Sequence, residues 1–373
     1  MNAVGKIIFA LTSFATTAAL AADLEIMHEY QSNPYKLSDD APGSRLVRAS
    51  IYHQEIFELP KKREFRLSAE GRHDKLLDVS EGDATLVKLR GRLVNRYRFG
   101  DRSASLLFTG DAGTKRAAYI DQRTSAPLQT SRGEDIRERF SYNFLKPSAE
   151  FTFRWNSQLS TGIFMAAERR DYISDYEELG LEALDYTELS IQPTLRYKTE
   201  GTYSRAYVYA RERSYDNRMI DDINGRNISG SELQFSLNGF GLSHQRDITA
   251  NWTVEAFLSG YSVQDNGVGY SNSDAISLNL SSEYQFGNSR SLDLEGTCMR
   301  RKNAFSRTPD SEDIDIGRQR EGCELTTAYE QPVMSESKRL KLRVEIRRSW
   351  EENTESIRSY DQWAVSVGFN YRW

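Results

Sequence analysis

The end of the chain alternates between large apolar residues and small or polar ones. Between positions 363 and 373, Ala364, Ser366, Gly368, Asn370 and Arg372 occupy the even positions. The odd positions hold Trp363, Val365, Val367, Phe369, Tyr371 and Trp373. A period of two predicts a β-strand whose two faces contact different surroundings.

The same alternation recurs along most of the chain. In Ala84–Phe99, the apolar residues on one face include Val87, Leu89 and Leu93, and cations fill the other face. Segments of this kind run from Leu24–Tyr30 to the C-terminus. They number about sixteen, with about 14 or 18 left open. We therefore expect an all-β protein, namely a transmembrane antiparallel up-and-down β-barrel.

The segments that join these strands alternate between short and long. Thr199–Thr202 is short, whereas Asn217–Gly230 and Asn303–Arg318 are long and polar. Outer-membrane barrels have this asymmetry, with short turns at one rim and long loops at the other. No connection is long enough to be an obvious loop folded into the barrel.

Two places make the strand assignment ambiguous. In Arg137–Trp155 the aromatic residues change face around Pro147, which indicates a bulge or an additional turn. In Ser231–Gln245 the pair Gly239 and Gly241 indicates a bend or bulge.

The N-terminus has the pattern of an export signal. Lys6 precedes the uncharged segment Ile7–Leu20, and Ala19 and Ala21 supply small residues for cleavage. We expect residues 1–21 to be a cleaved signal peptide and residues 22–373 to form a single barrel domain.

The terminal strand resembles that of Gram-negative outer-membrane β-barrels, of a porin-like or saccharide-channel-like kind, without a specific family. The resemblance implies integral insertion in the cell outer membrane, with both termini in the periplasm. It implies contact with the lipid bilayer and lipopolysaccharide, and recognition by the barrel assembly machinery. The residues that would carry the assembly signal are Phe369, Tyr371 and Trp373.

Composition agrees with a barrel. The mean hydropathy is −0.64, because only alternate residues of a barrel strand face lipid. The formal net charge of −5 comes from a mixed set of acidic and basic residues, which gives no reason to expect nucleic-acid binding.

Parity places many cations inside the barrel, because charged side chains are costly against lipid. The expected lumen residues are Lys88, Arg90, Arg92, Arg96, Arg98, Arg196, Arg205, Arg211, Lys341, Arg343 and Arg347. Fixed cations attract anions, and Tyr207, Tyr209 and Tyr261 offer faces for sugar rings. The predicted function is a charged, arginine-rich channel for saccharides or anionic solutes, linked in one version to surface polysaccharide export.

Two alternatives remain open. In the first, the cations form ion pairs that fill a narrow barrel, with partners among Glu188, Glu255, Glu283, Asp293, Glu295, Glu324, Glu330 and Glu345. In the second, the barrel does not conduct and acts as a hydrolase or as a binding or adhesion protein through its surface loops.

Catalytic and metal-binding patterns are not evident. His28, His53, His73 and His244 have no spacing that suits a metal. No Ser–His segment resembling the outer-membrane phospholipases is recognisable. We expect no enzymatic activity, no metal and no cofactor.

The only two cysteines are Cys298 and Cys323. They lie on the same face of consecutive strands, and the export route is oxidising, so we expect a disulfide. Two free buried thiols are the alternative, because a slip of two residues would separate the sulfur atoms.

Overall fold

The structure is a computed structural model. It describes residues 22–33, 43–60, 63–78, 83–119, 128–130, 132–173, 184–221, 227–267, 269, 271–303, 305–307, 314–316, 319–334, 337–354 and 359–372. The expected signal peptide and the terminal Trp373 lie outside the described residues.

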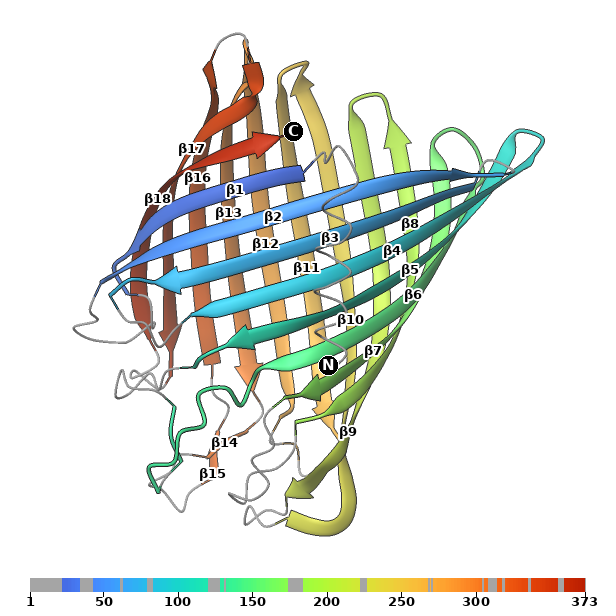
Figure 1. Cartoon of the computed structure of the whole chain (residues 1–373). Coiled ribbons are helices and arrows are strands. Elements are labelled where there is room, and N and C mark those ends of the chain that lie inside the picture. Colours follow the sequence, from blue (N-terminus) through green and yellow to red (C-terminus); the bar gives the residue numbers. More distant parts are fainter. Residues whose placement is uncertain are drawn as a thin grey trace.

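Within the described residues, sixteen antiparallel strands form one closed barrel, which confirms the predicted fold class and strand number (Figure 1). Each strand pairs with its sequence neighbour in the barrel, and β1 closes the ring by pairing with β18. The strands are β1 Ala22–Gln31, β2 Ser44–Leu59, β3 Arg63–Leu76, β4 Ala84–Phe99, β5 Arg102–Ala117, β6 Tyr142–Arg154, β7 Leu159–Tyr172, β8 Tyr186–Thr199, β9 Thr202–Asp221, β10 Asn227–Thr249, β11 Trp252–Asp265, β12 Ser273–Phe286, β13 Arg290–Asn303, β16 Gln319–Met334, β17 Ser337–Asn353 and β18 Tyr360–Arg372.

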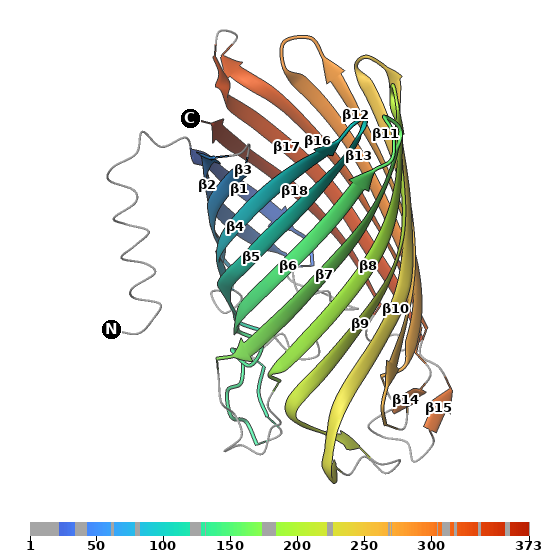
Figure 2. The same cartoon turned by 90° about the vertical axis from the view of Figure 1, so that its right-hand side faces the viewer.

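The two rims of the barrel differ as the sequence predicts. One rim carries tight turns, in which Gly100 (φ 61°) and Gly201 (φ 70°) adopt left-handed conformations that glycine takes at little cost. The start of β1 and the end of β18 lie at this rim, with Asp23 opposite Arg372. The other rim carries the longer connections, and β14 (Phe305–Arg307) pairs with β15 (Ile314–Ile316) there (Figure 2).

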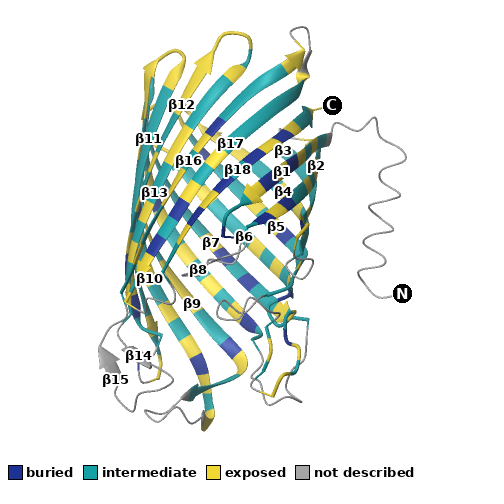
Figure 3. Cartoon of the chain, turned by 90° about the vertical axis from the view of Figure 1, so that its left-hand side faces the viewer, coloured by how far each residue is buried: buried dark blue, intermediate teal, exposed yellow. Residues whose placement is uncertain are grey.

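The faces of the strands separate by polarity. In β18, Trp363 is 49% exposed and Phe369 is 48% exposed, whereas Ala364 and Ser366 on the inner face are each 2% exposed. Bands of exposed and less exposed residues alternate along the strands (Figure 3). The period of two in the sequence therefore corresponds to an apolar outer face and a polar inner face.

Within the part of the chain that the structure describes, no helix is long and apolar enough to cross a membrane.

The prediction of a long loop at Asn217–Gly230 was wrong. Strand β9 continues to Asp221 and β10 begins at Asn227, so both strands extend into the segment predicted as a loop. The pairing shifts between Ile228 and Gln234, where the extended end of the hairpin continues past the rest of the wall (Figure 2). Polar residues without clear alternation hid this extension.

The ambiguity in Arg137–Trp155 is resolved without a bulge. Strand β6 begins only at Tyr142, and its register with β5 is continuous through Pro147. The aromatics change face because Tyr142 and Phe144 point into the lumen, whereas Phe151 faces outward with 43% exposure.

The connection between β5 and β6 therefore spans residues 118–141, longer than the sequence interpretation allowed. Its described part contains internal backbone hydrogen bonds, such as the one that the Tyr119 amide donates to the Arg137 carbonyl at 2.9 Å. Arg137 also donates to the Asp135 carboxylate at 2.7 Å, which lowers the pKa of Asp135 below its ordinary value. These contacts give the connection its own local order.

Strands β13 and β16 place Cys298 directly opposite Cys323, and the two form a disulfide with a Cα–Cα distance of 4.1 Å. The bridge lies on the outer face, with Leu278 of β12 beside Cys298 and Trp350 of β17 beside Cys323. It connects two strands at the base of the 304–318 connection.

We expect the purified protein to contain no alkylatable thiol before reduction. The bridge spans a sequence separation of 25 residues. The chain-entropy model predicts that its reduction lowers the free energy of unfolding by about 3 kcal/mol. Non-reducing mass spectrometry after alkylation counts the free thiols directly. Two alkylated cysteines without reductant would contradict the register of β13 and β16.

Candidate functional site

The structure places all the expected lumen cations on the inner face of their strands. In β4, outward-facing Tyr97 (48% exposed) and Phe99 (60% exposed) alternate with inward-facing residues. In β8, the odd-numbered residues Ile191 and Leu195 face outward, so the even-numbered Arg196 faces inward. The structure does not bring all these cations into one site, because they lie on β4, β8, β9 and β17, of which only β8 and β9 are neighbours.

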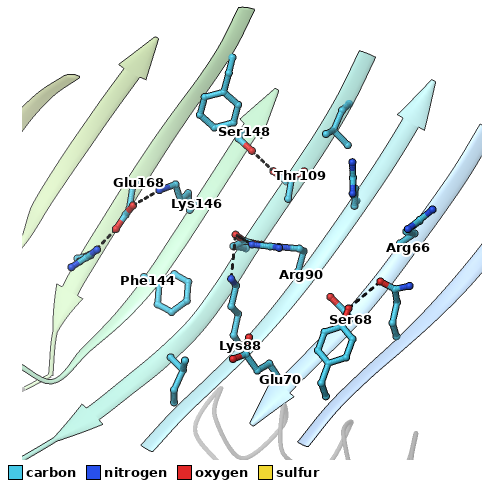
Figure 4. A pocket seen from close by; sticks show the side chains of 18 of the residues that line it. Arg66, Ser68, Glu70, Lys88, Arg90, Thr109, Phe144, Lys146, Ser148 and Glu168 are labelled. Carbon is cyan, nitrogen blue, oxygen red and sulfur yellow. Dashed lines mark hydrogen bonds and ion pairs between the residues drawn. The ribbon is translucent and has the colours of Figure 1, made fainter. Parts of the chain in front are cut away.

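Three of the cations, Lys88, Arg90 and Arg92 on β4, line a cavity of about 790 Å³ in the inner wall. The cavity lies against strands β2 to β7, and its side chains project into it from consecutive strands (Figure 4). Six cations and three carboxylates line it, namely Arg66, Lys88, Arg90, Arg92, Lys146 and Arg170, with Glu70, Asp111 and Glu168. Tyr52, Tyr142, Phe144 and Phe164 add aromatic surface. The lining therefore has more positive than negative groups.

Arg90 is fixed by Asp111, which is its register partner on β5. Nε of Arg90 donates to Oδ1 of Asp111 at 2.6 Å, and Nη2 donates to Oδ2 at 3.0 Å. Lys88 Nζ lies 3.8 Å from the same carboxylate. A bidentate pair of this geometry holds the guanidinium in one orientation.

Glu168 forms a second fixed group on β7. It accepts a hydrogen bond from Lys146 Nζ at 2.8 Å and another from Arg170 Nε at 2.6 Å. The guanidinium of Arg170 lies 4.5 Å from the centroid of the Tyr142 ring, within cation–π distance. One carboxylate thus holds two cations at this edge of the cavity.

The centre of the cationic surface is not compensated in this way. Arg92 is the register partner of Arg66, so two cations face each other across β3 and β4. Arg66 donates to Glu64 on its own strand. Among the described residues Arg92 has no hydrogen bond and no ion pair, and Glu64 attracts it electrostatically at longer range. Like charges directly opposite each other destabilise a strand pair.

The remaining cations of β4 lie nearer the short-turn rim. Arg96 is 3.9 Å from Glu64, and Arg98 donates to the carbonyl of Gly100 at 3.4 Å. Neither lines the cavity.

The cations of β17 are compensated. Lys341 pairs with Glu330, Arg343 pairs with Glu345 at 2.8 Å, and Arg347 donates to Glu29 at 2.9 Å. Glu29 is only 3% exposed. These three ion pairs fill the inner face beside the β1–β18 closure, and none of their residues lines the cavity. On this part of the wall, the geometry matches the alternative in which the cations form ion pairs that fill the barrel.

Within the described residues, three of the carboxylates expected as partners form ion pairs, namely Glu188, Glu330 and Glu345. The partners that sequence reasoning missed include Glu29, Glu64, Asp111, Glu150 and Glu168. Parity could have found them, because each lies on the inner face. Assigning each carboxylate to a particular cation required knowledge of the register between the strands.

A serine–histidine contact exists that the sequence did not reveal. His244 Nδ1 lies 2.9 Å from Ser204 Oγ, across β9 and β10. Both side chains share the outward parity of Leu242, which is 47% exposed. Among the described residues no carboxylate contacts His244, and an activated nucleophile needs a base held by a third group. The described residues also contain no group of three or more side chains placed to hold a metal.

No protein-family model and no curated protein sequence matches the chain. Among solved structures, Pseudomonas aeruginosa OccK8 (OprE) is similar with a TM-score of 0.51 at 8% identity, covering 95% of this chain and 98% of that one. A BenF-like porin from Pseudomonas fluorescens Pf-5 has a TM-score of 0.49 at 12% identity, with coverage of 95% and 99%. An anion-selective porin from Comamonas acidovorans has a TM-score of 0.47 at 11% identity, with the same coverage. The likeness to OccK8 shows a shared barrel fold over almost the whole of both chains.

Proposed function

We propose that this protein is an integral outer-membrane channel that passes anionic solutes, with acidic saccharides as the substrate class. The proposal combines a closed barrel, an apolar outer face and a cavity on the inner wall. Passive movement through such a lumen serves uptake and polysaccharide-linked export equally. It requires no catalytic residue and no cofactor.

The observation that carries the proposal is the surplus of cations in the cavity. Six cations and three carboxylates line the cavity, and Glu64 outside the lining pairs with Arg66, so the wall keeps a surplus of positive charge. Arg92, which has no hydrogen bond or ion pair among the described residues, faces Arg66. A fixed cation in a lumen attracts anions and lowers their entry barrier. The aromatic surface of Tyr52, Tyr142 and Phe144 suits the less polar faces of a sugar.

The placement in the membrane follows from the same architecture. We propose that the short-turn rim, which holds both ends of the barrel, faces the periplasm, and that the long connections face the cell exterior. Phe369 and Tyr371 on the outer face would contact lipid and the barrel assembly machinery. Lipopolysaccharide would contact the outer leaflet surface.

We expect wild-type barrels in a planar bilayer to give discrete conductance steps with a reversal potential that favours anions. A salt gradient across the bilayer measures this preference. Millimolar glucuronate on one side should reduce the current by occupying the cavity. Barrels that insert but give no steps, or that favour cations, would contradict the channel and support a structural role for the cations.

A further inference from the structure

A second pair of cations that face each other lies on β8 and β9, outside the cavity. Arg196 and Arg205 are register partners and both face inward. Arg196 is held by Glu150 and by the hydroxyl of Thr152 at 3.0 Å. Nε of Arg205 is buried and has no hydrogen-bond acceptor in the described structure. Like the pair of Arg66 and Arg92, this arrangement places two cations side by side.

An aromatic surface adjoins Arg205. Its guanidinium lies 4.8 Å from the centroid of the Tyr207 ring, and the Tyr207 ring stacks on Phe257 at 6.4 Å and 23°. Tyr209 follows on the same face, with the guanidinium of Arg211 5.0 Å from its centroid. The two tyrosines thus lie in line along β9, with a cation at each end.

Two glycines on β10 hold these rings flat against the wall. The bulge that the sequence suggested at Gly239 and Gly241 is not present, because the register with β9 is continuous there. A Cβ at Gly241 would lie 2.3 Å from Cζ of Tyr207, and one at Gly239 would lie 2.5 Å from Cζ of Tyr209. The glycines therefore provide the space in which the rings lie.

The charges of this surface call for an anionic partner. Like charges opposite each other weaken the strand pair, and a buried donor without an acceptor costs free energy. Arg211 is only weakly compensated, since Glu188 is 3.9 Å away and is hydrogen-bonded by Arg213 at 2.7 Å. A carboxylate bound at the guanidinium of Arg205 would reduce its repulsion with Arg196.

We propose that Arg205, Tyr207 and Tyr209 form a second binding station, at which an acidic sugar unit places its carboxylate on Arg205 and its ring on the tyrosines. This inference rests on the proposed channel function and specifies its substrate as an acidic oligosaccharide. Binding sites of this kind combine an aromatic surface with a few placed polar groups. None of the three residues lines the cavity, so the lumen has two stations.

A row of small and hydroxyl-bearing residues connects the two stations. Register partners run from Arg92 to Arg211 across β5 to β8 through Thr109, Ser148, Ala166 and Ser190. The cavity already reaches Phe164 on β7, and only β8 separates this edge from Tyr209 on β9, a distance of about 10 Å at the usual strand spacing. A chain of three sugar units can cover this distance, whereas a single unit occupies one station at a time. The substrate should therefore bind more tightly as its length increases.

Calorimetric titration of the folded barrel in detergent tests this with galacturonate and trigalacturonate. Wild-type protein should bind trigalacturonate at least tenfold more tightly than the monomer. The double variant Tyr207→Leu/Tyr209→Leu should bind trigalacturonate at least tenfold more weakly than wild type. The matched control Tyr207→Phe/Tyr209→Phe retains both rings and should bind as wild type does.

Arg205→Gln provides a second variant that leaves the rings in place, and it should also lose at least tenfold for the trimer. Equal affinity of wild type, the leucine pair and Arg205→Gln for the trimer would overturn the second station, as would the absence of any preference for the trimer. The bilayer measurement of anion preference is independent of this titration. A conducting, anion-selective barrel without the length preference would retain the channel and remove the station.

Discussion

Replacing Gly368 with valine should prevent the barrel from closing. Gly368 on β18 lies opposite Met27 on β1, at the closure between the first and last strands. A Cβ at this position would lie 2.3 Å from the backbone carbonyl oxygen of Ile26 and 2.2 Å from Sδ of Met27. The methionine side chain can move, but the carbonyl belongs to the partner strand. The cost should exceed the 1–3 kcal/mol, roughly, that overpacking of side chains usually incurs.

Heat-modifiable migration of the protein from outer-membrane fractions measures this effect. The matched control is Gly110→Val on β5, because a Cβ at Gly110 meets no atom within 4 Å. That valine shares the outward parity of Phe108, which is 45% exposed, so it faces lipid. Gly110→Val should fold as wild type does, whereas Gly368→Val should accumulate unfolded. Equal amounts of folded barrel for the two variants would contradict the register of β1 and β18.

The sequence predicted the strand ends best where the strands finish in tight turns. Ala84–Phe99 matches β4 at both ends, because Gly100 and the following charge interrupt the alternation at one end and a polar connection precedes the other. It predicted the long-connection rim less well. There β9 and β10 extend by pairing with each other, and their few apolar residues, Met219, Ile220 and Ile228, do not alternate with a period of two.

The inner face was predictable from parity, but the state of each cation was not. Arg90 and Arg92 have the same residue type, strand and face, yet Arg90 lies opposite Asp111 and Arg92 opposite Arg66. Arg347 meets Glu29 only because the ends of the chain pair, at a sequence separation of 318 residues. Ion pairs therefore account for the cations on one part of the wall, and the proposed solute path concerns another part.

Compensated cations stabilise the barrel and uncompensated ones are available to a solute. On the β16–β18 and β1 side, Glu29 and Glu330 neutralise Arg347 and Lys341. On β3–β4 and on β8–β9, the register places cations opposite each other. A wall selected only for stability would not favour these like-charge neighbours. This difference leads to a test in which stability and selectivity change independently.

Arg92→Glu and Arg90→Glu should shift anion selectivity in the same direction and stability in opposite directions. Arg92→Glu places a carboxylate opposite Arg66, which replaces repulsion with attraction and should stabilise the barrel by about 1 kcal/mol. Arg90→Glu breaks the bidentate pair and places a carboxylate opposite Asp111. It should destabilise the barrel by about 2 kcal/mol, the scale of hydrogen bonds between charged groups.

Reversal potentials and urea unfolding of the two variants in the same lipid provide both readouts. Each substitution changes the charge of the cavity lining by the same amount, so each should lower the preference for anions. A loss of stability in Arg92→Glu equal to that in Arg90→Glu would show that Arg92 has a stabilising partner and is structural. An unchanged reversal potential in Arg92→Glu would place Arg92 outside the path of the ions. If Arg92 lies beside Arg66 on the neighbouring strand and attracts the anionic solute, Arg92→Glu should raise the stability of the barrel and lower its preference for anions.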